Sequence, residues 1–178
     1  MAASKAAIRY ATALLDLSEE MGNLEKVKDD MVLLDDLCVS NRDLLAFLHS
    51  PIIQTRRKLK VYDALFQGKI EEVTLKFLKL ITKNKRENIL PEITESFIQQ
   101  YKKHKGILEV HVKSAIALEN NVRDAIRAQV KKHFEGEIEM HETIDQSLIG
   151  GFVVTVEDNQ IDASIKSQLA NLKNILLN

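Results

Sequence analysis

The side chains best suited to hold a metal ion are two histidines and two glutamates in the C-terminal half of the chain. Glu109 and His111 alternate with apolar residues, and Glu139 and His141 do so further along. If these segments were neighbouring strands with aligned polar faces, two imidazoles and two carboxylates could converge on a divalent ion. The same alternation describes the solvated faces of two amphipathic strands. We favour the solvated-face interpretation and expect no bound metal and no cofactor.

Other reactive residue types lack the context that chemistry requires. Cys38 falls on an apolar helical stripe, which predicts a buried small side chain rather than a nucleophile. The pair Gly150 and Gly151 matches neither a phosphate-binding loop nor a dinucleotide turn, and predicts a bulge or a close backbone approach at the start of a strand. The basic run at 83–86 indicates a solvated corner between helices. We therefore expect no catalytic residues.

Apolar residues recur at helical spacing throughout the first part of the chain. Only 6 Gly and 2 Pro interrupt 178 residues, which favours long helices with short links. Ser4, Asn23, Asn41 and Thr55 are expected as N-caps of the first four helices. Pro91 is expected in the first turn of the sixth. The six predicted helices cover residues 4–21, 24–38, 42–49, 56–67, 71–84 and 88–105.

The periodicity changes after Gly106. Alternating residues predict strands at 108–112, 138–141 and 152–156, with a helix at 119–134 between the first two. Ile161 can add a little further pairing, and Ser164 is expected to cap a final helix. The predicted fold is mainly α with a small α/β domain: a six-helix bundle over 1–105, then a strand-helix-strand-strand-helix domain over 106–178.

Composition excludes several classes of protein. With 25 basic and 26 acidic residues the chain is nearly neutral, which argues against a dedicated nucleic-acid binder. A single cysteine excludes an internal disulfide. No apolar stretch is long enough to span a membrane, and the N-terminus resembles neither a signal peptide nor a transit peptide. Residues 1–105 hold 18 basic and 15 acidic side chains, whereas 106–178 hold 7 and 11.

Two helices have features of protein-binding surfaces. The first is rich in alanine, and small side chains either admit a partner helix or allow tight packing inside the bundle. The last carries a leucine stripe, for which we favour packing on the sheet over a seam for a partner. The sequence leaves both questions open.

Three segments resemble one family. These are residues 9–14 (RYATAL), residues 77–81 (FLKLI) with 84–86 (NKR), and residues 147–154 (SLIGGFVV) followed by 161–165 (IDASI). Together they resemble the delta subunit of F-type ATP synthase, which is related to the mitochondrial oligomycin-sensitivity-conferring protein. The resemblance covers essentially the whole chain. Leu15 stands where Phe is common, and Gln146 where Pro is frequent.

The resemblance implies a non-catalytic stator subunit of a proton-translocating ATP synthase. Its N-terminal domain would bind the N-terminal helix of an alpha subunit of the catalytic head, and its C-terminal domain would bind the b subunit of the peripheral stalk. It would lie at the cytoplasmic face of the bacterial inner membrane and associate with the membrane only through the complex. The implied head-binding residues, in a groove between the first and fifth helices, are Ala7, Tyr10, Ala11, Leu14, Phe77 and Ile81. The implied stalk-binding residues are Leu169, Leu172 and Leu176.

Two other function classes rank below the stator. A metal-dependent enzyme would use Glu109, His111, Glu139 and His141, and an RNA-binding adaptor would use the basic corner at 83–86. In the stator interpretation, a bulky charged residue at Ala11 is expected to weaken head binding while the domain stays folded.

Overall fold

The structure is a computed structural model that describes residues 4–134, 136–156, 159–165 and 167. Its internal contacts divide the chain between Tyr101 and Lys102 into two compact units. We call these the helical unit and the sheet unit. Helix α6 continues past that division to Lys105, where the sequence places its domain boundary. In the part of the chain that the structure describes, no helix combines the length and the apolar character needed to cross a membrane.

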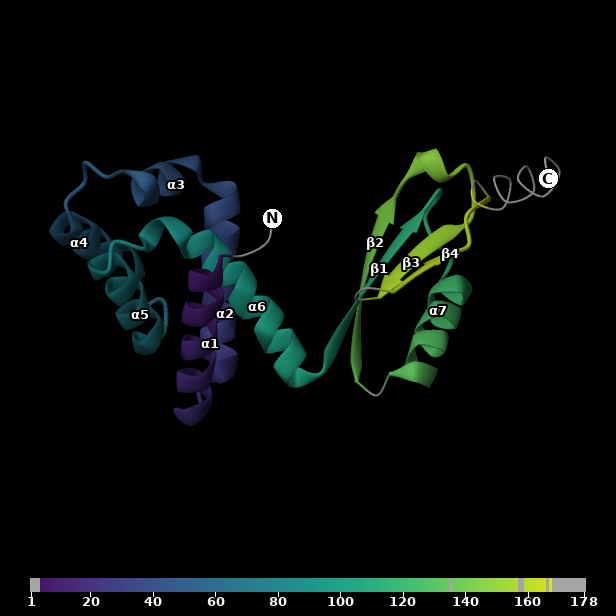
Figure 1. Cartoon of the computed structure of the whole chain (residues 1–178), viewed down its shortest axis with the longest axis horizontal. Helices are drawn as coiled ribbons and strands as arrows, with labels where there is room; N and C mark the ends of the chain where they lie inside the picture. Colours follow the sequence, from purple (N-terminus) through teal and green to yellow (C-terminus); the bar gives the residue numbers. More distant parts are fainter. Residues whose placement is uncertain (1–3, 135, 157–158, 166, 168–178) are drawn as a thin grey trace. The chain divides into compact units, whose positions relative to one another are not determined.

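The described residues contain six α-helices and one 3-10 turn before the sheet (Figure 1). This confirms the prediction of a helical N-terminal part followed by a small α/β part. The elements are α1 (Lys5–Glu20), α2 (Leu24–Ser40), α3 (Arg42–His49), α4 (Thr55–Phe66), α5 (Glu72–Lys83), the 3-10 turn η1 (Glu87–Ile89) and α6 (Leu90–Lys105).

Most helix starts follow the capping residues read from the sequence. The Ser4 hydroxyl accepts a hydrogen bond from Ala7 N at 3.3 Å, and the Asn41 side chain accepts two from the first turn of α3. Asn23 occupies the cap of α2 without a side-chain bond. The prediction that Thr55 caps α4 is wrong, because Thr55 is already helical and Gln54 precedes it as the cap.

The helical unit is held by a core drawn from every long helix. Its most buried apolar side chains come from α1, α2, α5 and α6, and α2 contacts both α1 and α5. In Figure 1, α1 runs beside α2 and α6. Hydrogen bonds from Gln100 of α6 to Ile8 O and from Thr12 to Gln100 join the α1–α6 pair. The fully buried apolar residues are Ala7, Ala11, Val27, Met31, Leu78, Ile81, Ile93 and Phe97.

The sheet unit contains a mixed sheet of four strands in the order β2-β1-β3-β4. β1 and β2 are parallel, and the other two pairings are antiparallel. The three strands predicted are present, but the sheet has a fourth. Ile161 pairs with Val154, so the expected extra pairing is confirmed as a complete strand. The elements are β1 (Ile107–Ser114), α7 (Asn120–His133), β2 (Glu137–Ile144), the 3-10 turn η2 (Gln146–Leu148), β3 (Phe152–Val156) and β4 (Asn159–Asp162).

Helix α7 covers one face of this sheet (Figure 1). Ile126 of α7 packs with Leu108, Val110, Val112 and Val154 from the strands. The alternate residues of β1 point to the other face, so its burial alternates along the strand. This arrangement places Glu109 and His111 of β1, with Glu139 and His141 of β2, on the face that α7 leaves uncovered.

The last helix of the sequence prediction starts where expected. Ser167 N donates to the Ser164 hydroxyl at 3.2 Å, which is the contact of an N-cap. The remainder of that helix, including Leu169, Leu172 and Leu176, lies outside the described residues.

Candidate partner-binding surfaces

Five of the six residues implied for head binding lie in the core of the helical unit. Ala7, Ala11, Leu14 and Ile81 are almost completely buried, and Phe77 is buried as well. Ala7 and Ala11 of α1 therefore serve tight packing inside the unit, one of the two roles left open by the sequence. Because these five side chains are buried, they can support a binding surface from below but offer almost no area for direct contact.

Tyr10, the sixth implied residue, joins α1 to α5 beside these buried side chains. Its ring meets the Phe77 ring edge-on, with centroids 6.3 Å apart and an interplanar angle of 73°. The Asn84 amide donates to the Tyr10 hydroxyl at 3.3 Å. Tyr10 is only half-buried, so this implied residue remains accessible beside the two helices.

Exposed apolar side chains flank the Tyr10–Phe77 contact. Ala13 and Leu17 follow Tyr10 on the same side of α1, and Leu80 lies one turn beyond Phe77 on α5. Leu17 is 44% exposed and Leu80 50% exposed. We call Tyr10, Ala13, Leu17 and Leu80 the α1–α5 surface. The resemblance did not select Leu17 or Leu80, because helical periodicity does not say which apolar residues a bundle leaves uncovered.

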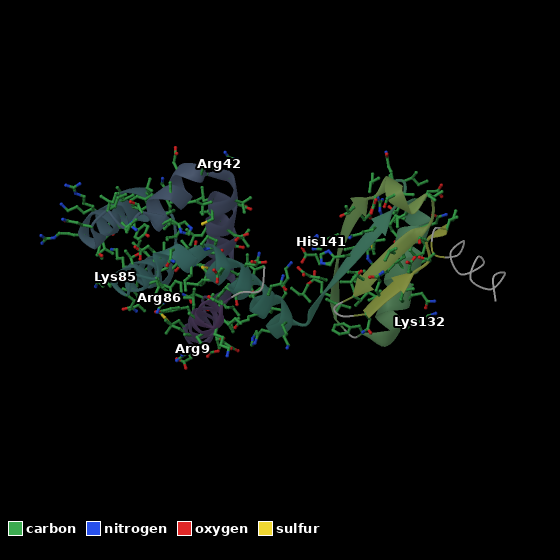
Figure 2. The ribbon with its side chains drawn as sticks, turned by 45° about the horizontal axis from the view of Figure 1, so that its top comes forward. Arg9, Arg42, Lys85, Arg86, Lys132 and His141 are labelled. Carbon is green, nitrogen blue, oxygen red and sulfur yellow. The ribbon has the colours of Figure 1, made fainter. Side chains whose placement is uncertain are left out.

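Basic side chains border this surface. Arg9 precedes Tyr10, while Lys85 and Arg86 follow Asn84, whose amide reaches Tyr10. All three are exposed and are labelled in Figure 2. The run at 83–86 is a solvated turn as predicted, and its charge adds to that of Arg9. A partner segment with acidic groups would suit this end of the surface.

The sheet unit has an apolar hollow between α7 and the strands. Its volume is about 790 Å³, and it lies open to solvent in the described part of the chain. Val122 and Val130 of α7 line one side together with Phe134, which directly follows the helix, and Phe152 and Ile161 line the other. We call this the α7 hollow. The sequence did not reveal this hollow, because predicting a helix and a sheet does not show how closely they pack against each other.

The opposite face of the sheet brings together all four residues considered for metal binding. Glu109 pairs with Glu139 and His111 with His141 in the parallel register of β1 and β2. The two imidazole rings stack with centroids 5.2 Å apart. Figure 2 labels His141 on this face and Lys132, from α7, on the other side of the sheet.

Lys102 completes this group from the last turn of α6. Its ammonium contacts a Glu109 oxygen and lies 2.7 Å from Glu139 Oε2. Burial alone would lower the pKa of Lys102, but the hydrogen bonds and charges of the two glutamates outweigh it and raise the pKa. We call Lys102, Glu109, His111, Glu139 and His141 the β1–β2 cluster. The sequence did not indicate this position of Lys102, because no local pattern links the residue to the strands.

The remaining candidates are structural. Cys38 is buried, and desolvation, helped by the Asp35 charge, raises its pKa to about 11, which keeps the thiol protonated and unreactive. Gly151 has a φ of +77°, and a Cβ there would lie 2.3 Å from the Ala163 carbonyl oxygen. The predicted close backbone approach at the glycine pair is thereby confirmed.

Comparison with known proteins identifies the family. The profile of the ATP synthase delta (OSCP) subunit matches residues 6–176. The chain belongs to this family. It is therefore related to structural subunits of the F-type ATP synthase along almost its whole length, as the resembling segments predicted.

Relatives of similar length support the assignment. The ATP synthase subunit delta of Cytophaga hutchinsonii is 34% identical over 98% of this chain and 95% of its own. That of Flavobacterium psychrophilum is 30% identical over the full length of both. A cryo-EM structure of the Toxoplasma gondii mitochondrial ATP synthase hexamer contains a chain with a TM-score of 0.75, 23% identity and coverage of 98% and 99%. That likeness shows a shared fold.

Proposed function

We propose that this chain is a non-catalytic stator subunit of a proton-translocating F-type ATP synthase. It would link the alpha-subunit N-termini of the catalytic head to the b subunit of the peripheral stalk, and so keep the head from turning with the rotor. Family membership over residues 6–176 is the observation that carries this proposal. We place the protein at the cytoplasmic face of the bacterial inner membrane, where it would be held through the complex.

Two separate compact units suit a connector with one interface at each end. We assign head binding to residues 1–105 and stalk binding to residues 106–178. The mechanism needs no reacting groups, because resisting torque depends on how slowly each interface releases. A helix laid in an apolar groove gains affinity from a few buried anchors rather than from total area.

For the head interface, we assign direct contact to the α1–α5 surface. Tyr10, Leu17 and Leu80 offer accessible apolar area, while Ala7, Ala11 and Ile81 support them from the core. Arg9, Lys85 and Arg86 add positive charge beside Tyr10. An amphipathic alpha-subunit helix would place its apolar stripe on Leu17 and Leu80 and an acidic group near Arg9.

The Ala11 substitution expected to leave the domain folded is unsuitable as a test. Ala11 has no exposed surface, so a bulky charged residue there would disrupt the packing of α1. Leu17→Glu and Leu80→Glu change exposed positions instead. Each is expected to weaken binding of an alpha-subunit N-terminal peptide about tenfold or more, as loss of an apolar anchor does. Isothermal titration of the full chain measures this.

Ile52→Glu is the matched control. Ile52 lies in the link between α3 and α4 and is 89% exposed, so the substitution adds the same charge away from the α1–α5 surface. Peptide affinity should be unchanged. If Leu17→Glu and Leu80→Glu bind as tightly as the Ile52→Glu control, the assignment of this surface is wrong.

For the stalk interface, we assign Leu169, Leu172 and Leu176 of the helix predicted from the sequence, and the α7 hollow as a further apolar site of the same unit. Leu172→Glu should reduce binding of a C-terminal b-subunit segment while leaving binding of the alpha peptide unchanged. Ile116→Glu, at a 76% exposed position outside the hollow, serves as control. Loss of both partners in one variant would indicate unfolding.

Purification of the native complex tests the function as a whole. The protein should arrive from bacterial membranes together with the alpha and b subunits, and its removal should uncouple ATP hydrolysis from proton transport. Recovery only as a free protein, with a fully coupled complex, would overturn the stator proposal.

A further inference from the structure

The β1–β2 cluster shares no residue with the α1–α5 surface or with the α7 hollow, and it holds four potential metal ligands on one face. His111 and His141 face each other in register on parallel strands, where paired side chains project in the same direction. Their ring planes differ by only 23°. Each Nε2 lies 3.9 Å from a Glu109 carboxylate oxygen, and His141 Nε2 lies 3.5 Å from Glu139 Oε1. Donors of Glu109, Glu139 and His141 therefore surround one small region, with His111 Nε2 beside Glu109.

We propose that this cluster binds Zn²⁺ through His111, His141 and Glu109, with Glu139 as a second carboxylate. Two imidazole nitrogens and a carboxylate oxygen form a ligand set that zinc favours. One ligand atom each from Glu109, Glu139 and His141 already lies within 4.8 Å of the others. Ligand atoms on one tetrahedral zinc are about 3.3 Å apart.

The movement needed to close the site is small. The side chains of His111 and His141 are 54% and 43% exposed, so they can rotate without displacing core residues. The backbones of β1 and β2 are already fixed by their shared ladder. Rotation of the two imidazoles would bring their nitrogens toward the Glu109 and Glu139 carboxylates.

Lys102 shows that the glutamates attract a cation and also competes for them. Its ammonium bridges Glu109 and Glu139, so a metal ion must share or displace it. Removing that charge takes away one cation that competes for both carboxylates. The proposal therefore makes a distinctive prediction: Lys102→Met binds zinc more tightly than the unmodified chain. A purely structural ion network would give no such gain.

A bound ion would join two strands that are distant in sequence. β1 and β2 are connected through α7, and a metal across His111 and His141 would tie their exposed sides together. Ligands that bind only the folded state raise the thermal midpoint. Zinc should accordingly slow amide exchange in β2.

The test uses the full chain, prepared without a polyhistidine tag and freed of metal. Titration with Co²⁺, followed by its visible absorption, and with Zn²⁺, followed by calorimetry, should each give one equivalent. His111→Ala and His141→Ala should each weaken binding at least about tenfold. His49→Ala removes an exposed histidine from α3 and should change nothing. Lys102→Met should strengthen binding severalfold.

Three outcomes would overturn the proposal. One is an absence of saturable binding at millimolar metal, and another is equal affinity in the His111→Ala, His141→Ala double variant. The third is weaker binding by Lys102→Met. Circular dichroism checks that each variant is folded, and His111→Asn with His141→Asn replaces the alanine variants if either is not. Because the assay needs no ATP synthase partner, its result is independent of the stator proposal.

Discussion

Each unit of the molecule contains a lysine that contacts glutamate, but one of the two lysines is fully buried and the other is partly exposed. Lys58 of α4 lies in the core of the helical unit, where its ammonium contacts Glu87 Oε1 at 2.7 Å and the Leu48 carbonyl at 2.9 Å. Lys102 bridges Glu109 and Glu139 on the partly open face of the sheet unit. Charges in an interior attract strongly but lose their hydration, whereas charges near water are screened. The lysine–glutamate contacts should therefore contribute differently to the stability of the two units.

The helical unit uses other buried polar contacts in the same way. Asp30 of α2 accepts hydrogen bonds from Glu71 N and the Thr74 hydroxyl at the start of α5. The Thr82 hydroxyl donates to the buried Tyr62 hydroxyl. These contacts specify which helix ends meet. In the sheet unit, the β1–β2 cluster lies on the face that α7 leaves uncovered.

Lys58→Met tests the comparison with the largest expected effect. It would leave Glu87 buried without its cation, and Glu87 Oε2 already has no hydrogen-bond partner. Breaking a buried pair from one side costs on the order of 3–5 kcal/mol. Urea unfolding followed by circular dichroism at 222 nm measures the loss.

Lys76→Met provides the control in the same unit. Lys76 pairs with Glu72 one turn away on the surface of α5, and both side chains are largely exposed. Its removal should leave the urea midpoint nearly unchanged. Similar losses in Lys58→Met and Lys76→Met would show that burial does not distinguish the two pairs.

A second prediction compares two glycines with positive φ, one in each unit. Gly151→Ala would place a Cβ 2.3 Å from the Ala163 carbonyl oxygen, whereas Gly22→Ala meets no atom within 4 Å. Both carry backbone strain of about 1 kcal/mol. The additional clash should raise the loss of stability in Gly151→Ala to roughly 3 kcal/mol. Hydrogen exchange of β3 and α1 amides measures the two separately, and equal losses would argue against the close approach.

Local patterns in the sequence predicted most elements of this fold. The bounds of α3 follow from Asn41 with Pro51, and those of β3 from the alternation of Phe152, Val154 and Val156 with their neighbours. The patterns failed where distant residues decide. β4 is short and exposed, and only its pairing with β3 makes it a strand. Gln54 caps α4 without any side-chain bond, so no capping signature marks it.

The candidate sites show the same division. Alternation correctly grouped Glu109, His111, Glu139 and His141, because period-two patterns fix which side chains share a face. That alternation could not include Lys102, because Lys102 reaches these residues from the last turn of α6 and its position depends on tertiary structure. Similarly, Ala11 and Leu80 both belong to apolar helical stripes, but tertiary packing buries the first and exposes the second.

A third prediction concerns alkaline pH and the core of the helical unit. Burial is the main cause that raises the pKa of Tyr62 to about 12, despite the opposing hydrogen bond from Thr82. Above pH 10 an unfolded tyrosine loses its proton while the native one keeps it. Stability therefore falls as the pH rises from 10 to 12, by roughly 1–1.5 kcal/mol at pH 11.

Tyr62→Phe isolates this contribution. The variant is expected to be less stable at pH 8, because the buried contact between the Tyr62 and Thr82 hydroxyls is lost, but to lose less stability between pH 8 and pH 11. Urea unfolding at both values gives the difference. The Cys38 thiol, whose pKa burial also raises, is present in both proteins and cancels. Equal alkaline losses in the two proteins would contradict the role assigned to Tyr62.

The smallest predicted loss of stability is that of Lys102→Met, the counterpart of Lys58→Met in the sheet unit. Lys102→Met removes a cation whose contacts lie partly in water, so the loss should not exceed about 1 kcal/mol. The raised pKa of Lys102 adds no pH dependence near neutrality, because the group stays charged in both the folded and unfolded states. Urea unfolding of Lys102→Met beside Lys58→Met measures the contrast. A loss as large as that of Lys58→Met would mean that the sheet unit also depends on a buried charge, and that this face of β1 and β2 is not free to exchange its lysine for a metal ion.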